Sequence, residues 1–134
     1  MSSRNYKYYQ PNKKDLKDNY GDCAVRAFMK AEGYESWVDA YDKMWEISRE
    51  VQCPMNCKHG FEHIMKTLGY TYTGISNKKG SKRPTVDSFA KNHKQGTYVC
   101  VVASHYVTVA DGYYYDIWDC GEKSLYGYWE KPQE

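Results

Sequence analysis

The stretch Tyr20-Gly21-Asp22-Cys23-Ala24 runs directly into an apolar-periodic segment, Val25-Arg26-Ala27-Phe28-Met29-Lys30-Ala31. The pattern predicts a helix that begins near Asp22, whose carboxylate suits a first turn, and ends at Gly33 in a left-handed cap. Cys23 then lies in the first turn. The positive end of a helix stabilises a thiolate at that position. The sequence therefore singles out Cys23 as a candidate nucleophile.

The rest of the chain places helices first and strands last. Ser36-Trp37-Val38-Asp39 is similar to a capping box and predicts a second helix that reaches about Val51. Further predicted elements are helices at 60–68 and 84–90, and strands at 70–73, 97–103, 105–110, 113–118 and 125–129. This segregation favours an α+β fold, in which N-terminal helices pack on a C-terminal antiparallel sheet, over βαβ alternation.

Length and composition predict one domain. The chain has 134 residues, of which 41% are hydrophobic, and this is enough to bury a core and hold a rigid site. We expect a single domain over residues 1–134, with residues 1–18 as an extended arm on its surface. The net charge of +2 is too small to indicate nucleic-acid binding, which needs clustered basic charge.

Cysteine usage and the length of the apolar runs indicate the compartment. Five cysteines is an odd number, and residues 1–6 carry no apolar signal-peptide core. No apolar run reaches about 18 residues, so the sequence predicts no membrane span. We therefore expect a monomer in the reducing cytoplasm, with Cys100 buried as a small hydrophobic residue.

A histidine and two aspartates lie near a predicted hairpin. His105 begins an alternating strand, and Asp111-Gly112 is a strong two-residue turn signal. With that turn, His105 opposes Trp118, and Asp116 is a diagonal neighbour on the same face. A bulge that shifts the pairing by one residue would instead place Asp119 opposite His105. Both aspartates are therefore candidate partners of His105.

The order Cys, His, Asp along the chain supplies the parts of a catalytic triad. Cys23 would attack a carbonyl carbon, His105 would act as the base, and Asp116 or Asp119 would orient the histidine. Such a site performs acyl transfer without a metal, and we expect no cofactor. A triad alone does not distinguish proteases, isopeptidases, deamidases, amidases and acyl transferases.

Short motifs resemble those of papain-like cysteine peptidases. Asp22-Cys23 is similar to the motif of peptidases that process bacteriocin leaders, and Asp116-Ile117-Trp118 is similar to the Asn-Ser-Trp of papain. The resemblance covers about residues 18–129, and small phage and bacterial proteins with this layout come closest. It implies a papain-like fold and thiol protease activity, with Cys23 as nucleophile, His105 as base, Asp116 as orienter and Trp118 shielding the contact between the last two.

One position departs from the family pattern. Papain-like enzymes usually place an oxyanion-hole Gln six residues before the Cys, and this chain has Lys17 there. Asn19, four residues before Cys23, is the nearest side-chain amide that could donate to an oxyanion beside the Cys23 backbone amide. Lys17 is the alternative donor.

Two other readings compete with the enzyme. Cys53, Cys57, His59 and His63 are four sulfur and nitrogen groups close together, as in a zinc module, although their spacing is unusual for zinc. The chain could also be an interaction module, either a papain-like fold without activity or a phage-encoded inhibitor. Such a module would use exposed aromatic residues such as Tyr113, Tyr114 and Tyr126.

The arrangement of lysines indicates a class of substrate. Residues 6–17 and 78–83 are the two long irregular segments able to border a cleft, and both carry lysines. We therefore expect a narrow peptide, isopeptide or amide substrate on a peptide or protein, with acidic residues beside the scissile bond. A phage-encoded enzyme of this kind would act in the host cytoplasm, and general digestion of casein-like proteins is not expected.

Overall fold

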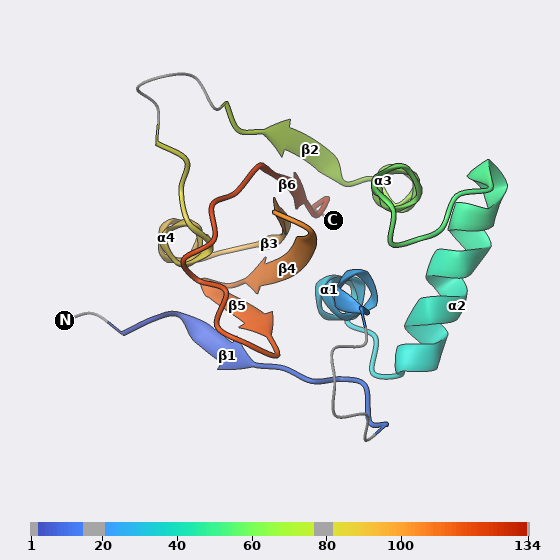
Figure 1. The fold of residues 1–134 in the computed structure, drawn as a ribbon, viewed down its shortest axis with the longest axis horizontal. Helices are drawn as coiled ribbons and strands as arrows, with labels where there is room; N and C mark the ends of the chain where they lie inside the picture. Colours follow the sequence, from blue (N-terminus) through green and yellow to red (C-terminus); the bar gives the residue numbers. More distant parts are fainter. Residues whose placement is uncertain (1–2, 15–20, 77–81, 134) are drawn as a thin grey trace.

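The computed structural model describes residues 3–14, 21–76 and 82–133 (Figure 1). In chain order, their elements are β1 (Tyr6–Tyr8), α1 (Cys23–Glu32), α2 (Trp37–Ser48), the 3-10 turn η1 (Arg49–Val51), α3 (Lys58–Thr67), β2 (Thr71–Gly74), α4 (Val86–Asn92), β3 (Thr97–Val102), β4 (His105–Ala110), β5 (Tyr113–Asp116) and β6 (Gly127–Glu130). Every predicted helix and strand is present, with its ends moved by three residues or fewer. The fold is α+β. None of the described helices is both long and apolar enough to cross a membrane.

The predicted signals at the helix ends act largely as expected. Gly33 adopts the left-handed conformation that closes α1, with φ of 77°, and its N–H donates to the carbonyl of Met29. The Ser36 hydroxyl accepts a hydrogen bond from the Asp39 N–H at the start of α2. Asp22 is different, because its side chain does not cap α1. Its carboxylate is held elsewhere, as described below.

The sheet is mixed, which corrects the expectation of an antiparallel one. Its strand order is β1-β5-β4-β3-β6-β2, and every neighbouring pair is antiparallel except β1 and β5. Part of the predicted surface arm is this parallel edge strand, in which Tyr6 pairs with Tyr114 and Tyr8 with Asp116. Parallel pairing with a distant strand leaves no turn signal in the sequence, so a pattern based on local residues misses it.

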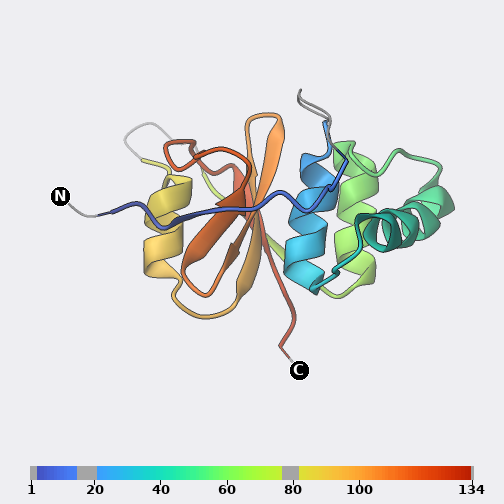
Figure 2. The ribbon, with the colours of Figure 1, turned by 90° about the horizontal axis from the view of Figure 1, so that it is seen from below.

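Helices cover both faces of the sheet (Figures 1 and 2). One apolar cluster joins α1, α2 and α3 to the sheet, and a second joins α4 to the opposite face. Strand β3 divides between them, because Val99 belongs to the first cluster and Cys100 to the second. Burial on both faces explains why the sequence of β3 is almost continuously apolar.

The β4–β5 hairpin has the predicted two-residue turn. Ala110 pairs with Tyr113, and the turn residues Asp111 and Gly112 have φ values of 50° and 88°. Positive φ at both positions is what a type I′ turn requires. The start of β4 and the end of β5 therefore lie together at one end of the sheet.

We predict that Gly112→Ala destabilises the fold, because a β-carbon is strained at φ of 88°. The expected loss in the free energy of unfolding is about 1–2 kcal/mol, measured by urea denaturation. Gly74→Ala is the matched control, since Gly74 lies in a strand without positive φ and its added carbon would make an ordinary contact with Tyr72. Equal losses in the two variants would contradict the turn assignment.

Candidate active site

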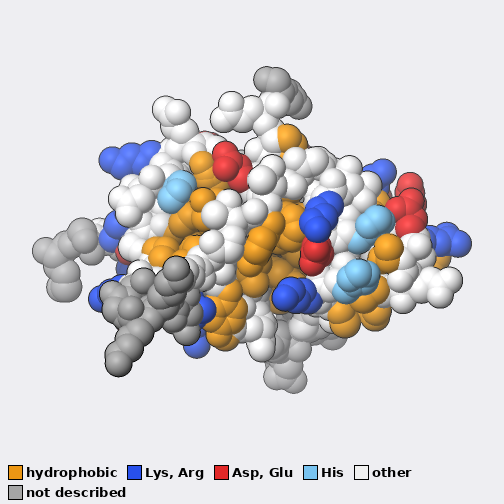
Figure 3. Space-filling view, turned by 90° about the horizontal axis from the view of Figure 1, so that it is seen from above, with side chains coloured by type: hydrophobic (Ala, Val, Ile, Leu, Met, Phe, Trp, Pro, Cys, Tyr) orange, Lys and Arg blue, Asp and Glu red, His pale blue; other side chains and the backbone are white. Residues whose placement is uncertain are grey.

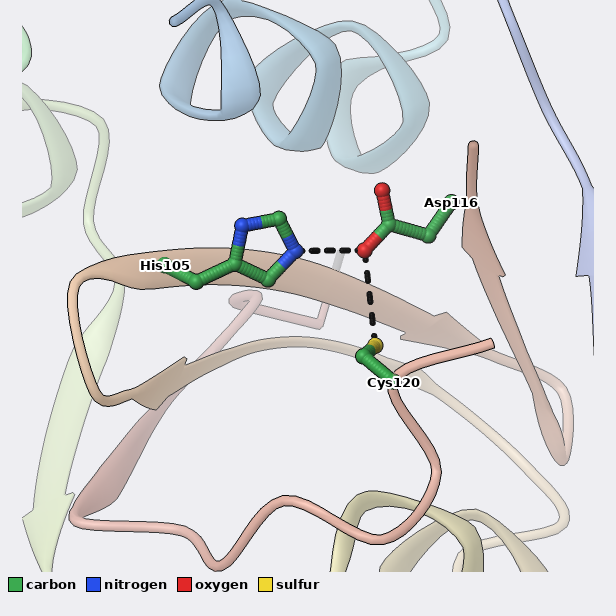
Figure 4. Close-up of side chains that lie close together, drawn as sticks. All are labelled: His105, Asp116 and Cys120. Atoms are coloured by element: carbon green, nitrogen blue, oxygen red, sulfur yellow. Dashed lines mark hydrogen bonds and ion pairs between the residues drawn. The ribbon is translucent and has the colours of Figure 1, made fainter. Parts of the chain in front are cut away.

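Three of the sequence-predicted residues meet at one end of the sheet. Cys23 begins α1, His105 begins β4 and Asp116 ends β5. The Thr108 hydroxyl holds α1 against β4 by donating to the carbonyl of Ala27 at 2.6 Å. His105 Nε2 donates to Asp116 Oδ2 at 2.5 Å, and its second ring nitrogen lies on the side of α1 (Figure 4).

The Asp116 carboxylate is fully buried and surrounded by donors. Its Oδ1 accepts from Arg26 Nε at 3.1 Å and from the Ile117 N–H at 2.8 Å. Its Oδ2 accepts from His105 and from the Cys120 thiol, the latter at 3.4 Å (Figure 4). Burial opposes ionisation, but the hydrogen bonds and positive charges of His105 and Arg26 lower the pKa of Asp116 below its ordinary value.

His105 and Cys23 have pKa values shifted in opposite directions. Burial would lower the pKa of His105, but hydrogen bonds and charge interactions with Asp116 and Cys23 raise it to about 9. Burial would raise the pKa of Cys23, but hydrogen bonds with His105 and the Tyr106 backbone, together with the charges of His105 and Arg26, lower it. This pattern favours a thiolate–imidazolium pair near neutral pH.

Arg26 is a site residue that the sequence analysis missed. It lies one turn after Cys23, is 3% exposed, and bridges two carboxylates. Its Nη1 donates to Asp22 Oδ1 at 2.8 Å, while its Nε donates to Asp116. The available signal was a charged residue inside the apolar run from Ala24 to Met29, since a buried arginine requires paired carboxylates.

Asp22 anchors the other end of this ion-pair network. It is 6% exposed, and its Oδ2 accepts from Trp37 Nε1 at 3.0 Å and from Asn12 Nδ2 at 3.4 Å. Helix α2 and the N-terminal arm are therefore linked through Asp22 and Arg26 to the carboxylate that holds His105. We call Asp22, Arg26 and Asp116 the carboxylate–arginine chain.

The alternative partner, Asp119, is engaged elsewhere. It accepts from the Tyr114 hydroxyl and from the Gly121 N–H. The two-residue turn explains this outcome, because the register shift that would have brought Asp119 to His105 does not occur. Trp118 lies beside His105, with 5.4 Å between the ring centroids, as the papain resemblance implied.

The oxyanion donor predicted at Asn19, and its alternative Lys17, lie outside the described residues. Gln10, however, lines one cleft together with Cys23. The Asn12 N–H donates to Gln10 Oε1 at 3.0 Å, which leaves the Gln10 amide nitrogen as a donor. Asn19 is close to Cys23 along the sequence, whereas Gln10 is more distant in sequence and lines the cleft because it follows strand β1.

The predicted zinc ligands do not converge. In the described part of the chain, no three of Cys53, Cys57, His59 and His63 have ligand atoms within 4.8 Å of one another. His63 instead bonds Glu50 at 2.9 Å. Among the described residues, the cluster that meets this distance is His105, Asp116 and Cys120.

The chemistry of that cluster fits hydrogen bonding better than metal binding. Two ligands of one zinc ion lie about 3 Å or more apart, because each bond is about 2 Å long, whereas His105 and Asp116 are 2.5 Å apart. Burial and the charge of Asp116 raise the pKa of the Cys120 thiol, so it remains a protonated donor. The adjacent Arg26 guanidinium would also repel a cation.

A large cleft opens over Cys23 and His105. Its volume is about 1610 Å³, and it runs between the N-terminal arm, α3 and the strand ends. Its aromatic and aliphatic lining residues are Tyr8, Phe61, Tyr70, Tyr72, Val101, Val102, Tyr106, Ile117, Trp118, Tyr126 and Trp129. The space-filling view shows a band of apolar surface across the middle of one face, with basic and acidic side chains beside it (Figure 3).

Comparison with known proteins adds no family. Searches of protein-family models, of curated proteins and of solved structures find no match to this chain. Its function is therefore inferred from its own residues and their geometry.

We predict that Asp116→Asn lowers the pKa of His105 from about 9 toward its ordinary value of 6.5, because a neutral amide no longer stabilises the imidazolium. Titration of the imidazole resonances by NMR measures this. Asp119→Asn is the control and should leave His105 unchanged. A His105 that titrates equally in both variants would contradict the assigned pair.

The same pKa shift predicts how stability depends on pH. A folded-state pKa of about 9 means that imidazolium pairing stabilises the fold fully below about pH 6.5, and that this contribution is lost as pH rises through about 9. Urea denaturation from pH 6 to 10 should therefore show a decline in the wild type that is smaller in Asp116→Asn.

We predict that Arg26→Met destabilises the fold by about 3–5 kcal/mol, because it leaves two buried carboxylates without their shared counter-ion. Arg26→Lys should lose less, since one ammonium keeps the charge but cannot bridge both carboxylates as a guanidinium does. In the Lys variant, alkylation of Cys23 should also need a higher pH. An unchanged alkylation profile would limit Arg26 to a structural role.

Proposed function

We propose that this protein is a cysteine-nucleophile hydrolase or acyl transferase of papain-like architecture, acting on a peptide or amide substrate. The observation that carries the proposal is the placement of His105. One of its nitrogens bonds a buried carboxylate, and the histidine also lowers the pKa of a cysteine at a helix start, in the floor of a large cleft. Structural cysteines have no need of such surroundings.

The first chemical step is acyl transfer to sulfur. The Cys23 thiolate attacks the carbonyl carbon of the substrate, and the carbonyl oxygen becomes an oxyanion beside the Cys23 backbone amide. The Gln10 amide, from the arm that lines the same cleft, would supply a second donor. His105, as the imidazolium, then gives its proton to the leaving nitrogen while the C–N bond breaks. The product is a thioester and a free amine.

The second step releases the acyl group. His105 is now neutral and takes a proton from an incoming water, whose oxygen attacks the thioester carbon. The C–S bond breaks, the acid leaves, and Cys23 and His105 return to the ion pair. An amine in place of water would make the same site an acyl transferase, and no cofactor takes part in either route.

Asp116 keeps the histidine ready for both steps. Its carboxylate keeps a proton on Nε2 of His105, so that the other ring nitrogen is the one that exchanges protons with Cys23 and the substrate. The same carboxylate stabilises the imidazolium. Arg26 and the Ile117 N–H hold the opposite oxygen, so the carboxylate cannot rotate away from the histidine. Trp118 limits the access of water to this contact from one side.

The interaction-module alternative has less support. Of the three tyrosines that it would use, Tyr114 is fully buried, while Tyr113 and Tyr126 are exposed. An inactive scaffold also does not need a buried carboxylate and arginine to tune a cysteine. Retention of the whole charge arrangement favours the enzyme.

We predict that Cys23 is the first of the five cysteines to react with iodoacetamide at pH 6.5, because its pKa is lowered while burial raises those of Cys100 and Cys120. Peptide mass spectrometry after brief labelling measures the order. His105→Ala should slow the labelling of Cys23 by about tenfold or more, since each unit of pKa changes the thiolate fraction about tenfold.

Labelling led by Cys53 or Cys57, and unaffected by His105→Ala, would refute the proposal. Both are free cysteines away from the triad, so they serve as internal controls within the same sample. Tris(2-carboxyethyl)phosphine in the reaction keeps all five thiols reduced without competing as a thiol.

A further inference from the structure

The cleft over Cys23 is larger than a site for one small molecule. Small-ligand sites usually have volumes of about 300–1,000 Å³, and this cleft has about 1610 Å³. It is lined by residues from the N-terminal arm, from α3 and from both halves of the sheet. A groove of this size and extent suits a segment of polymer chain.

Exposed aromatic side chains gather in this groove. Of the eight large apolar side chains that are exposed among the described residues, four line the cleft: Tyr8, Tyr72, Trp118 and Tyr126. The Tyr72 ring packs on Trp129 at 4.8 Å and lies across Gly127, where an added β-carbon would collide with it. The Tyr72 ring is thus held in place yet remains exposed, which is typical of a contact residue at a binding surface.

The sheet order places these rings on both sides of the triad. His105 starts β4, which has β5 and β1 on one side and β3, β6 and β2 on the other. Tyr8 ends β1 and Trp118 follows β5, whereas Tyr126 precedes β6 and Tyr72 lies in β2. A chain that crosses the strand ends would therefore meet aromatic surface before and after the carbonyl that Cys23 attacks.

The charge of the groove is mainly positive. Its lining includes Lys14, Lys58 and Lys66, and one acidic side chain, Glu62, which is bonded to Lys66 at 2.7 Å. Arg26 also lines it, but its charge is already balanced by Asp22 and Asp116. Lys14 lies on the arm and Lys58 at the start of α3. Positive charge therefore comes from both walls of the groove and favours a negatively charged chain.

We propose that the groove binds an internal segment of a polypeptide, with large apolar side chains on both sides of the attacked bond and acidic residues beside them. The enzyme would accordingly cut within a chain and would not trim free ends. This inference rests on the proposed function for the position of attack, and it adds the class of substrate. Lys14 belongs to the segment 6–17 that the sequence indicated, whereas Lys58 and Lys66 belong to α3. Residues 78–81 of the second indicated segment, 78–83, lie outside the described residues.

The test uses the Cys23→Ala protein and a displayed library of random peptides flanked by constant sequence at both ends, so that no random segment has a free terminus. We expect selected peptides to share two apolar positions separated by a short spacer, with acidic neighbours. Tyr8→Ala and Tyr72→Ala, each in the Cys23→Ala background, should each weaken binding of a selected peptide about tenfold. Each variant should also lose the preference for an apolar residue at one of the two positions, and the two variants should differ in which position is affected. Lys58→Gln should weaken binding mainly at low salt.

Tyr113→Ala is the matched control, because Tyr113 is as exposed as Tyr72 but does not line the cleft. Its binding should stay within twofold of the parent. The inference would be overturned if no motif is selected, or if all three tyrosine variants lose binding equally. It would also be overturned if peptides are selected only from a parallel library in which the random segments have free termini.

The labelling experiment on wild-type protein separates this inference from the proposed function. An unreactive Cys23 combined with the two-sided motif would refute the enzyme and support the peptide groove. A reactive Cys23 without the motif would leave the enzyme intact and overturn the substrate class alone.

Discussion

The buried bridge between Arg26 and two carboxylates is the constraint on which the site depends. Isolated charges are strongly disfavoured in a protein interior, so Asp22, Arg26 and Asp116 must be buried together or not at all. Because these residues come from the start of α1 and the end of β5, their pairing fixes the helix relative to the hairpin. The position of Cys23 relative to His105 follows from that, since Cys23 directly follows Asp22 in the chain and His105 is hydrogen-bonded to Asp116.

This arrangement also separates two tasks that one carboxylate must perform. Asp116 has to remain ionised inside the protein, and it has to keep one oxygen aimed at His105. Arg26 and the Ile117 N–H occupy Oδ1, while His105 and the Cys120 thiol occupy Oδ2. The donors on one oxygen thus balance the charge and leave the other oxygen for the histidine. Even the buried Cys120 contributes as a donor.

Local signals in the sequence predicted the parts of the site that depend on neighbouring residues. The helix at Cys23 and the two-residue turn at Asp111-Gly112 were readable, and that turn determines that Asp116 and not Asp119 faces His105. What depends on distant partners was not readable. The parallel pairing of Tyr6 with Tyr114 leaves no turn motif in the sequence. Arg26 is indistinguishable by sequence from an ordinary charged helix residue, because its partner Asp116 lies 90 positions away along the chain. The Gln10 amide reaches the cleft only because the strand before it is anchored in the sheet.

The anchoring of the arm also orders events during synthesis. The arm is held to the carbonyl of Asp116 by the Tyr6 hydroxyl and the Tyr9 N–H, and Asp116 is made long after the nucleophile. While the ribosome is still producing the first strands, the Cys23 thiol has neither its histidine nor its carboxylate, and it keeps the low reactivity of a free cysteine. The surroundings that Cys23 has in the folded protein are therefore assembled only after β5 has been synthesised and has paired with β1.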